Sequence, residues 1–287
     1  MADSVLITGA STGLGKVTAL HLAERGFVVY AAMLDLADRA AVEEPARERG
    51  LDVRAVQLDI RDRASIDAAV QTIVRETGGI FALVNNAGTR LRGCFEDLTD
   101  AEIRRLFDTN LFGTMGVCRA VLPHMRAARR GRIVMMTSIA GRIGSFGVGA
   151  YCASKFAQEG FAESLAQEVK PFGIDVVVIE PAIIRTEAWG ANRVTAAAAF
   201  NAASPYAAWF KRAEELADRM VQTSPTTPMH VAEAVHAALA NPPSRLRIAV
   251  GWRAQLVLTA RKLVPAAVFE RVYFGQLMKM ITSTATK

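Results

Sequence analysis

Short runs of apolar, often β-branched residues recur along the chain and alternate with amphipathic segments. The runs are Val5 to Thr8, Phe27 to Met33, Val53 to Leu58, Phe81 to Asn85, Ile133 to Ser138, Ile174 to Glu180 and Leu246 to Val250. Nearly continuous apolar runs are typical of strands buried on both faces of a parallel sheet. The segments between them, such as Lys16 to Arg25 and Ser65 to Arg75, are long enough for crossover helices. The pattern therefore predicts an α/β fold, a doubly wound parallel sheet of about seven strands with helices on both faces.

The alternation of strands and helices continues without a linker to about residue 187, which predicts one domain over residues 1–287. Residues 188–228 interrupt it with alanine-rich, partly helical sequence, and we expect a substrate-covering insertion there. Residues 252–287 form an amphipathic C-terminal extension. This extension could complete a pocket, pair with another subunit or lie on a membrane surface, and we rank the three roles in that order.

Composition narrows the class of protein. Lys and Arg number 34 against 28 Asp and Glu, but the positive residues are scattered, so we expect no nucleic-acid partner. The cysteines Cys94, Cys118 and Cys152 lack CxxC spacing, and we expect neither disulfides nor a metal site. No basic leader precedes Val5 and no apolar stretch approaches the roughly 20 residues of a membrane-spanning helix. The sequence predicts a cytoplasmic protein with no transmembrane segment.

Unusual polar and glycine residues follow the predicted strands directly. Gly9 follows the first strand, Asp59 the third, Asn86 the fourth, and Pro181 the sixth, while Ser138 ends the fifth. Ligands of doubly wound sheets bind beyond the carboxyl ends of the strands. These residues therefore predict a ligand site at one edge of the sheet.

A glycine-rich loop lies between the first strand and the first helix. Its sequence from Thr8 is TGASTGLG, and we expect cofactor contacts from Gly9, Ser11, Thr12, Gly13, Leu14 and Gly15. Without Cβ atoms such a loop can turn tightly and direct amides at a diphosphate, while the helix start adds positive potential. An ordinary glycine turn is the alternative, but the position between strand and helix favours a dinucleotide cradle on a Rossmann-type sheet.

The end of the second strand bears on the choice between NAD and NADP. A carboxylate there accepts from the ribose 2′-hydroxyl, whereas a basic side chain meets a 2′-phosphate. The strand ends in Leu34 and Asp35, and neither Leu34 nor the residue before Gly13 is basic. Asp35 therefore favours NAD, although it could instead face water.

Tyr151 and Lys155 are four residues apart at the start of a helical segment, so both side chains lie on one helix face. A free tyrosine titrates near 10, and a neighbouring ammonium favours its phenolate. The pair could therefore transfer a proton at neutral pH. By itself, a packed tyrosine beside a solvated lysine would be the simpler interpretation.

Ser138 and Asn110 add to this pair. Ser138 ends the fifth strand, and the glycine-rich segment before Tyr151 could fold its hydroxyl beside the phenol, so that two hydroxyls bind one carbonyl oxygen. Capping the strand end is its plain alternative. Asn110 is mildly unfavourable within a helical pattern. It could hold a water that links Lys155 to solvent, or be an ordinary core asparagine.

These motifs, in this order, resemble the short-chain dehydrogenase/reductases over about residues 4 to 190, and the hydroxysteroid and retinol dehydrogenases most of all. The resemblance implies a catalytic tetrad of Asn110, Ser138, Tyr151 and Lys155, and a homodimer or homotetramer. Lys155 would also hold the nicotinamide ribose. Further cofactor contacts implied by it are Tyr151, Asp59, Ile60, Asn86, Ala87, Gly88, Pro181, Ile184 and Thr186. The chain departs from the family at Ala182, where glycine is usual, and at Leu34, where those relatives have arginine.

The same resemblance implies a lipophilic secondary or allylic alcohol, or its carbonyl, as the small-molecule substrate. Ser138 would bind it, and Phe146, Val148 and Trp189 could line an apolar pocket together with Phe200, Tyr206 and Trp209, although aromatic residues in such segments are as often packing. A catalytically silent nucleotide-sensing regulator on the same fold is the main alternative. Such a regulator would keep the glycine loop but would not need the tetrad.

Overall fold

The computed structural model of the protein describes residues 2–186, 193–241 and 244–283. Its centre is a seven-stranded sheet in the order β3-β2-β1-β4-β6-β7-β9, in which all neighbouring strands are parallel. The strands are β1 (Ser4–Thr8), β2 (Val28–Met33), β3 (Val53–Gln57), β4 (Ala82–Asn85), β6 (Gly131–Met136), β7 (Ile174–Pro181) and β9 (Arg247–Val250). Each predicted apolar run forms one of these strands, so the predicted doubly wound sheet is confirmed.

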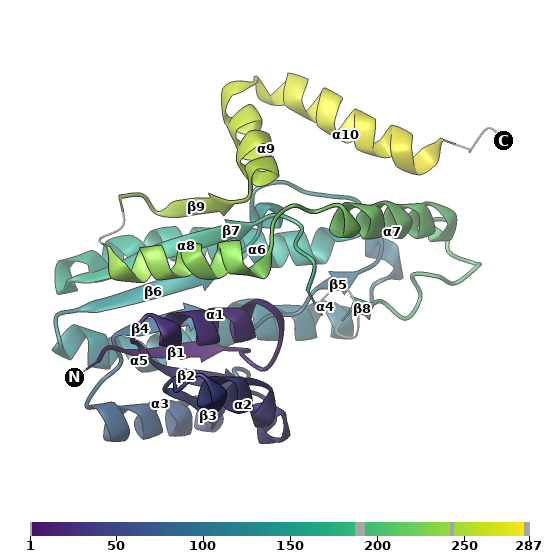
Figure 1. The fold of residues 1–287 in the computed structure, drawn as a ribbon. Helices are drawn as coiled ribbons and strands as arrows, with labels where there is room; N and C mark the ends of the chain where they lie inside the picture. Colours follow the sequence, from purple (N-terminus) through teal and green to yellow (C-terminus); the bar gives the residue numbers. More distant parts are fainter. Residues whose placement is uncertain (1, 187–192, 242–243, 284–287) are drawn as a thin grey trace.

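Helices cover both faces of this sheet (Figure 1). One face carries α1 (Gly13–Glu24), α2 (Ala40–Glu48) and α8 (Pro228–Ala240), and the other carries α3 (Arg63–Thr77), α5 (Thr114–Ala127) and α6 (Gly149–Val169). Side chains of a strand alternate between the two layers: in β1, Val5 and Ile7 pack in one and Leu6 in the other. Burial on both faces explains why the strands are nearly continuously apolar.

The chain reverses its direction across the sheet at β1. From β1 it runs outward to β2 and β3, and it then crosses back to β4 on the other side of β1. The carboxyl ends of β1 and β4 therefore border a crevice, which is where open α/β sheets bind their ligands.

Irregular helical turns interrupt or connect several of these elements. Helix α4 (Asp100–Phe107) continues into a π-helical turn, Asp108–Gly113, before α5 begins. Short 3₁₀ turns follow several elements and span Leu36–Arg39, Phe95–Asp97, Ile139–Gly141 and Lys170–Phe172. π turns inside helices occur frequently at functional sites, so Asn110 in this turn merits attention.

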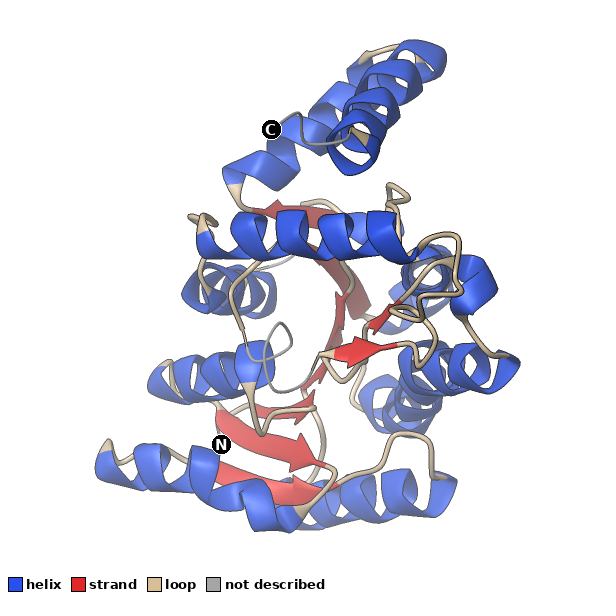
Figure 2. Cartoon of the chain, turned by 90° about the vertical axis from the view of Figure 1, so that its right-hand side faces the viewer, coloured by secondary structure: helices blue, strands red, loops and turns tan. Residues whose placement is uncertain are grey.

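The region predicted as an insertion is attached to the segment that follows β4. Its short strand β8 (Val194–Thr195) pairs in parallel with β5 (Leu91–Arg92), and this small pair stands apart from the main sheet in Figure 2. Helix α7 (Ala207–Gln222) follows. The pairing holds residues 193–222 beside the crevice, whereas residues 187–192, which include the predicted pocket residue Trp189, lie outside the described residues.

The C-terminal extension forms α9 (Trp252–Leu263) and α10 (Ala266–Thr282), which leave the body of the protein after β9 (Figure 1). Helix α10 returns to α7, where Arg212 Nη1 donates to the carbonyl of Ile281 at 3.3 Å. Across the described residues, no helix is long and apolar enough to cross a membrane.

Candidate active site

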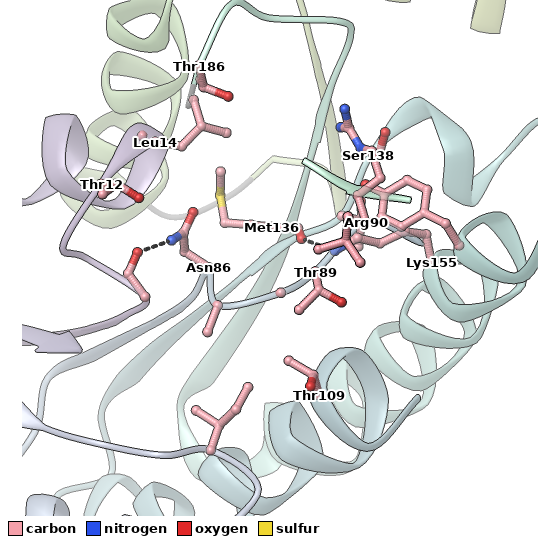
Figure 3. Close-up of a pocket in the computed structure, with 18 of the residues that line it drawn as sticks. Thr12, Leu14, Asn86, Thr89, Arg90, Thr109, Met136, Ser138, Lys155 and Thr186 are labelled. Carbon is pink, nitrogen blue, oxygen red and sulfur yellow. Dashed lines mark hydrogen bonds between the residues drawn. The ribbon is translucent and has the colours of Figure 1, made fainter. Parts of the chain in front are cut away.

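A cavity of about 790 Å³ occupies the crevice beyond β1 and β4 (Figure 3). The predicted cofactor residues line it, with the exception of Gly15 and Asp35. Those that do are Gly9, Ser11, Thr12, Gly13, Leu14, Asp59, Ile60, Asn86, Ala87, Gly88, Tyr151, Lys155, Pro181, Ile184 and Thr186. Thr12 and Leu14 lie on one side of the cavity, and Ser138 and Lys155 lie on the other (Figure 3).

The glycine loop fits a diphosphate because its backbone is both turned and held. Gly9 and Gly13 adopt left-handed conformations with φ of +65° and +55°. A Cβ on Gly15 would lie 2.3 Å from the Gly9 carbonyl oxygen, so Gly15 supports the loop from behind. Asn86 Nδ2 donates to that same oxygen at 2.8 Å (Figure 3), and α1 begins at Gly13. The loop thus faces the cavity with the positive end of a helix.

The far end of the cavity contains a paired charge and an apolar side chain. Arg61 Nη2 donates to the Asp59 carboxylate at 2.7 Å, and this hydrogen bond keeps the pKa of Asp59 below its usual value. Leu34 is 60% exposed and lines the cavity. Asp35 instead accepts a hydrogen bond from the Ala37 amide at 2.9 Å. Its carboxylate therefore caps the turn after β2, a contact different from the predicted one with a ribose.

Tyr151 and Lys155 are both buried on α6, with 7% and 5% of their surfaces exposed. Lys155 Nζ lies 5.9 Å from the centroid of the Tyr151 ring and donates to the Met136 carbonyl at 2.9 Å. Lys155 is therefore not a solvated surface lysine. Both side chains line the cavity.

Ser138 makes contacts that fit both sequence interpretations. Its Oγ accepts a hydrogen bond from the Ala140 amide at 3.1 Å, which caps the turn after β6. Its side chain also hydrogen-bonds with Tyr151. The two hydroxyls therefore lie together at the end of the cavity.

Arg90 is a residue of the site that sequence reasoning missed. It lies between β4 and β5, and its guanidinium carbon is 5.2 Å from the centroid of the Tyr151 ring. Its side chain also hydrogen-bonds with Tyr151. Figure 3 places Arg90 beside Ser138 and Lys155. Two cations therefore face one phenol.

These neighbouring groups shift the pKa of the Tyr151 phenol. Burial opposes ionisation of Tyr151, but the charges of Arg90 and Lys155, together with the hydrogen bonds with Arg90 and Ser138, outweigh it, so the pKa of Tyr151 is lowered. Burial and the charge of Arg90 lower the pKa of Lys155, while the Tyr151 and Glu159 charges oppose that shift. The Tyr151 phenol therefore ionises at lower pH than a free tyrosine.

Asn110 is completely buried in the π turn and does not line the cavity. Its amide oxygen accepts from the Thr89 amide at 2.8 Å, and its Nδ2 donates to the Thr89 carbonyl at 2.9 Å and to Ser154 Oγ at 3.0 Å. Its backbone carbonyl accepts from the side chain of Gln158. The Gln158 amide thus lies between the Asn110 carbonyl and Lys155, and the expected water that links Lys155 to solvent stays a prediction.

A second, apolar cavity of about 180 Å³ adjoins the first at Arg90, Ser138, Tyr151 and Ala182. Phe146 and Val148 line it as predicted, but Phe200, Tyr206 and Trp209 line neither cavity. Its remaining walls are mostly apolar and come largely from α7, α10 and the segment after β6: Ile139, Ala140, Ile143, Ala213, Leu216, Ala217, Met220, Tyr273, Leu277 and Ile281. The C-terminal extension thus contributes to the pocket, which was the first of its three expected roles.

A doubly wound sheet with a glycine cradle at its switch point defines a dinucleotide-binding protein of the α/β class. Residues 3–197 match the family described as short chain dehydrogenase. Human retinol dehydrogenase 5 is 32% identical over 96% of this chain and 89% of its own length. A solved short-chain dehydrogenase from Streptomyces avermitilis has 31% identity and a TM-score of 0.81, with coverage of 96% of this chain and 98% of that one. The chain belongs to the short-chain dehydrogenase family, as the sequence motifs predicted.

Some similar proteins match over a shorter region. The 3-ketodihydrosphingosine reductase of Bacteroides thetaiotaomicron is 39% identical over 63% of this chain and 64% of its own length. Mouse retinol dehydrogenase 5 is 37% identical over 63% of this chain and 57% of its own length. The chain therefore spans less than two thirds of the length of these relatives.

Proposed function

We propose that this protein is a nicotinamide-dependent oxidoreductase that interconverts a lipophilic secondary or allylic alcohol and its carbonyl compound, with Tyr151 as acid and base. The proposal rests on the groups that surround the Tyr151 phenol. Lys155, Arg90 and Ser138 converge on it where a dinucleotide cleft meets an apolar pocket. A catalytically silent nucleotide sensor would have no use for this arrangement.

Each residue around the phenol has its own role in the proposed reaction. When an alcohol is oxidised, Tyr151 as phenolate takes the hydroxyl proton, and when a carbonyl is reduced, Tyr151 as phenol returns it. Ser138 donates to the same substrate oxygen and stabilises the negative charge that develops there. Lys155 and Arg90 favour the phenolate by charge. A bound nicotinamide dinucleotide would accept the hydride in one direction and supply it in the other.

The cofactor would be held by the glycine loop at its diphosphate and by Asn86 to Gly88, Pro181, Ile184 and Thr186 along the cleft. We favour NAD over NADP. The support comes from Leu34, which puts an apolar side chain where a 2′-phosphate requires a cation. Arg61 is near, but its charge is engaged by Asp59. Asp35 supports NAD less directly than the sequence suggested, since it caps the following turn.

The apolar pocket supports a lipophilic substrate. Among its described lining residues the charged ones are Arg90 and Arg92, and Arg92 Nε donates to Glu214 at 2.6 Å. The names of similar proteins point the same way, since retinol and 3-ketodihydrosphingosine are lipophilic molecules. The region 188–228 and the extension 252–287 would cover and complete this pocket.

A homodimer or homotetramer in the cytoplasm is the assembly and location that we propose. Phe112 beside Asn110 and Phe156 beside Lys155 are 59% and 43% exposed, which suits helices that pack against another subunit. Light scattering of the purified protein would reveal the assembly. A monomer at micromolar concentration would contradict it.

The acid and base role is tested by Tyr151→Phe, which removes only a hydroxyl. We expect kcat with retinol, which is an allylic alcohol, or with a hydrophobic secondary alcohol to fall at least about 100-fold, because general acid and base catalysis contributes this much. Binding of NADH, followed by its fluorescence, should be retained. Tyr206→Phe is the matched control, since its hydroxyl donates to Glu96 outside the pocket. Retained activity in Tyr151→Phe would refute the role, and a wild-type protein that binds NADH without turning over any alcohol or carbonyl would favour the nucleotide sensor.

A further inference from the structure

Gln158 lies on α6 within one turn of Lys155 and is 2% exposed. Tyr151, Lys155 and Gln158 are spaced by four and three residues, so all three side chains share one face of the helix. Neither of the two cavities is lined by Gln158. It therefore lies behind the reacting end of the site.

The side-chain amide of Gln158 connects two parts of that site. Lys155 Nζ donates to Gln158 Oε1 at 2.8 Å, and Gln158 Nε2 donates to the Asn110 backbone carbonyl at 2.5 Å and to Thr114 Oγ1 at 3.1 Å. Thr114 Oγ1 in turn donates to the Asn110 carbonyl at 2.8 Å. One amide thus links α6 to the π turn that holds Asn110.

The chemistry of its partners fixes how this amide is oriented. An ammonium group can only donate, so it requires the oxygen end of the amide, and a backbone carbonyl can only accept, so it requires the nitrogen end. A flipped amide would lose both contacts in a buried site, where an unmade hydrogen bond is costly. Lys155 is consequently held between Gln158 Oε1 and the Met136 carbonyl.

We propose that Gln158 is a positioning residue that holds the Lys155 ammonium beside Tyr151 and replaces solvent between Lys155 and the Asn110 carbonyl. The inference rests on the proposed function. It gives the protein a closed hydrogen-bond chain behind Lys155. The amide joins the Lys155 ammonium to the Asn110 carbonyl by direct hydrogen bonds.

Removal of the amide oxygen should weaken the charged form of Lys155 and thereby the phenolate. The charged and titratable groups that face Lys155 are Tyr151, Arg90 and Glu159, and all of them remain in a Gln158 variant. A change in pH dependence can therefore be assigned to the lost contact. In the oxidation direction the rise of kcat/KM with pH should move to higher pH.

Two substitutions separate positioning from packing. Gln158→Leu keeps the volume, excludes water and removes the acceptor, whereas Gln158→Ala opens a small polar space in which a water can bridge Lys155 and the Asn110 carbonyl. We expect kcat for alcohol oxidation at neutral pH to fall about tenfold or more in Gln158→Leu and less in Gln158→Ala. The melting temperature should follow the opposite order, with Ala below Leu, because Ala leaves a cavity.

The control is Gln167→Leu, the same change at an exposed position of the same helix. It should leave kcat and the pH profile unaltered. The inference would be overturned if Gln158→Ala had both the lower melting temperature and the lower kcat of the two variants. A pH profile of Gln158→Leu identical to that of the wild type would overturn it as well. Tyr151→Phe is measured in parallel: if it retains activity, the proposed function fails, whereas an inactive Tyr151→Phe beside an unchanged Gln158→Leu refutes only the role of Gln158.

Discussion

The guanidinium of Arg90 lies over the ring of Tyr151, with its carbon 5.2 Å from the ring centroid. This contact comes from a strand-to-strand segment, whereas Lys155 approaches the same ring from one turn further along α6. The phenol is therefore activated from two directions.

The charge of Arg90 can be tested through the pH dependence of the reaction. Burial raises the pKa of Tyr151 and the Arg90 and Lys155 charges lower it, so Arg90→Met should raise this pKa. Oxidation requires phenolate, and its kcat/KM should then begin to rise only at higher pH. Reduction requires phenol, and its fall at high pH should shift in the same direction. Arg90→Lys should shift the profiles less. Arg105→Met removes a charge from the cavity wall, and a shift as large as that of Arg90→Met would argue against the contact.

The cofactor preference is tested at Leu34. Leu34→Arg places a cation at the cavity wall, and it should raise kcat/KM with NADPH relative to NADH by about tenfold or more, because a charge-assisted hydrogen bond to phosphate becomes available. Ala37→Arg is the matched control, since Ala37 is exposed on the same turn but does not line the cavity. A wild-type enzyme that already prefers NADPH strongly would contradict the preference for NAD.

The lipophilic pocket is tested on α10. Leu277→Trp adds bulk to the wall of the apolar cavity, so it should raise KM for large hydrophobic alcohols while affinity for NADH stays the same. Met280→Trp is the control, because Met280 is 55% exposed on the same helix and does not line the cavity. Equal effects of the two variants, or none, would mean that α10 does not complete the substrate site.

The glycine loop is tested by a substitution that should change both the free energy of unfolding and the affinity for NADH. A Cβ on Gly15 would meet the Gly9 carbonyl oxygen at 2.3 Å and Asn86 Nδ2 at 2.6 Å, so Gly15→Ala must shift the loop. We expect a loss of about 1–3 kcal/mol in the free energy of unfolding and weaker NADH binding. Gly160→Ala on α6 has no atom within 4 Å of its Cβ and should be neutral or stabilising by about 0.5–1 kcal/mol. Wild-type binding and stability in Gly15→Ala would contradict the proposed fit.

The fold was predictable because its signal is local and repeated. Strands buried on both faces are nearly continuous apolar runs, and each run can be recognised in the sequence before any tertiary contact is known. The site was predictable where spacing along one element decides it, as for Tyr151 and Lys155. Its position at the carboxyl ends of the strands followed from the topology alone.

Other parts of the site depend on contacts between distant elements. Arg90 has no periodic relation to Tyr151, and only the path of the chain after β4 brings the two together. The contact of Asp35 with a ribose stays a prediction, but the hydrogen bond from the Ala37 amide to its Oδ1 depends on local turn geometry that the sequence pattern does not reveal. Gln158 could have been found, since it shares the face of α6 with Lys155, yet its second partner, the Asn110 carbonyl, becomes accessible through the π turn.

The pKa of one phenol of this protein, that of Tyr151, is lowered, and the small number of tyrosines allows this to be measured directly. The chain has four. Burial raises the pKa of Tyr30 to about 12, a hydrogen bond to Glu96 raises that of Tyr206, and burial raises that of Tyr273, whereas the pKa of Tyr151 is lowered. An ultraviolet difference titration of the folded protein should therefore reveal a single phenolate that forms at lower pH than the other three and disappears in Tyr151→Phe. A first ionisation that survives in Tyr151→Phe would contradict the account.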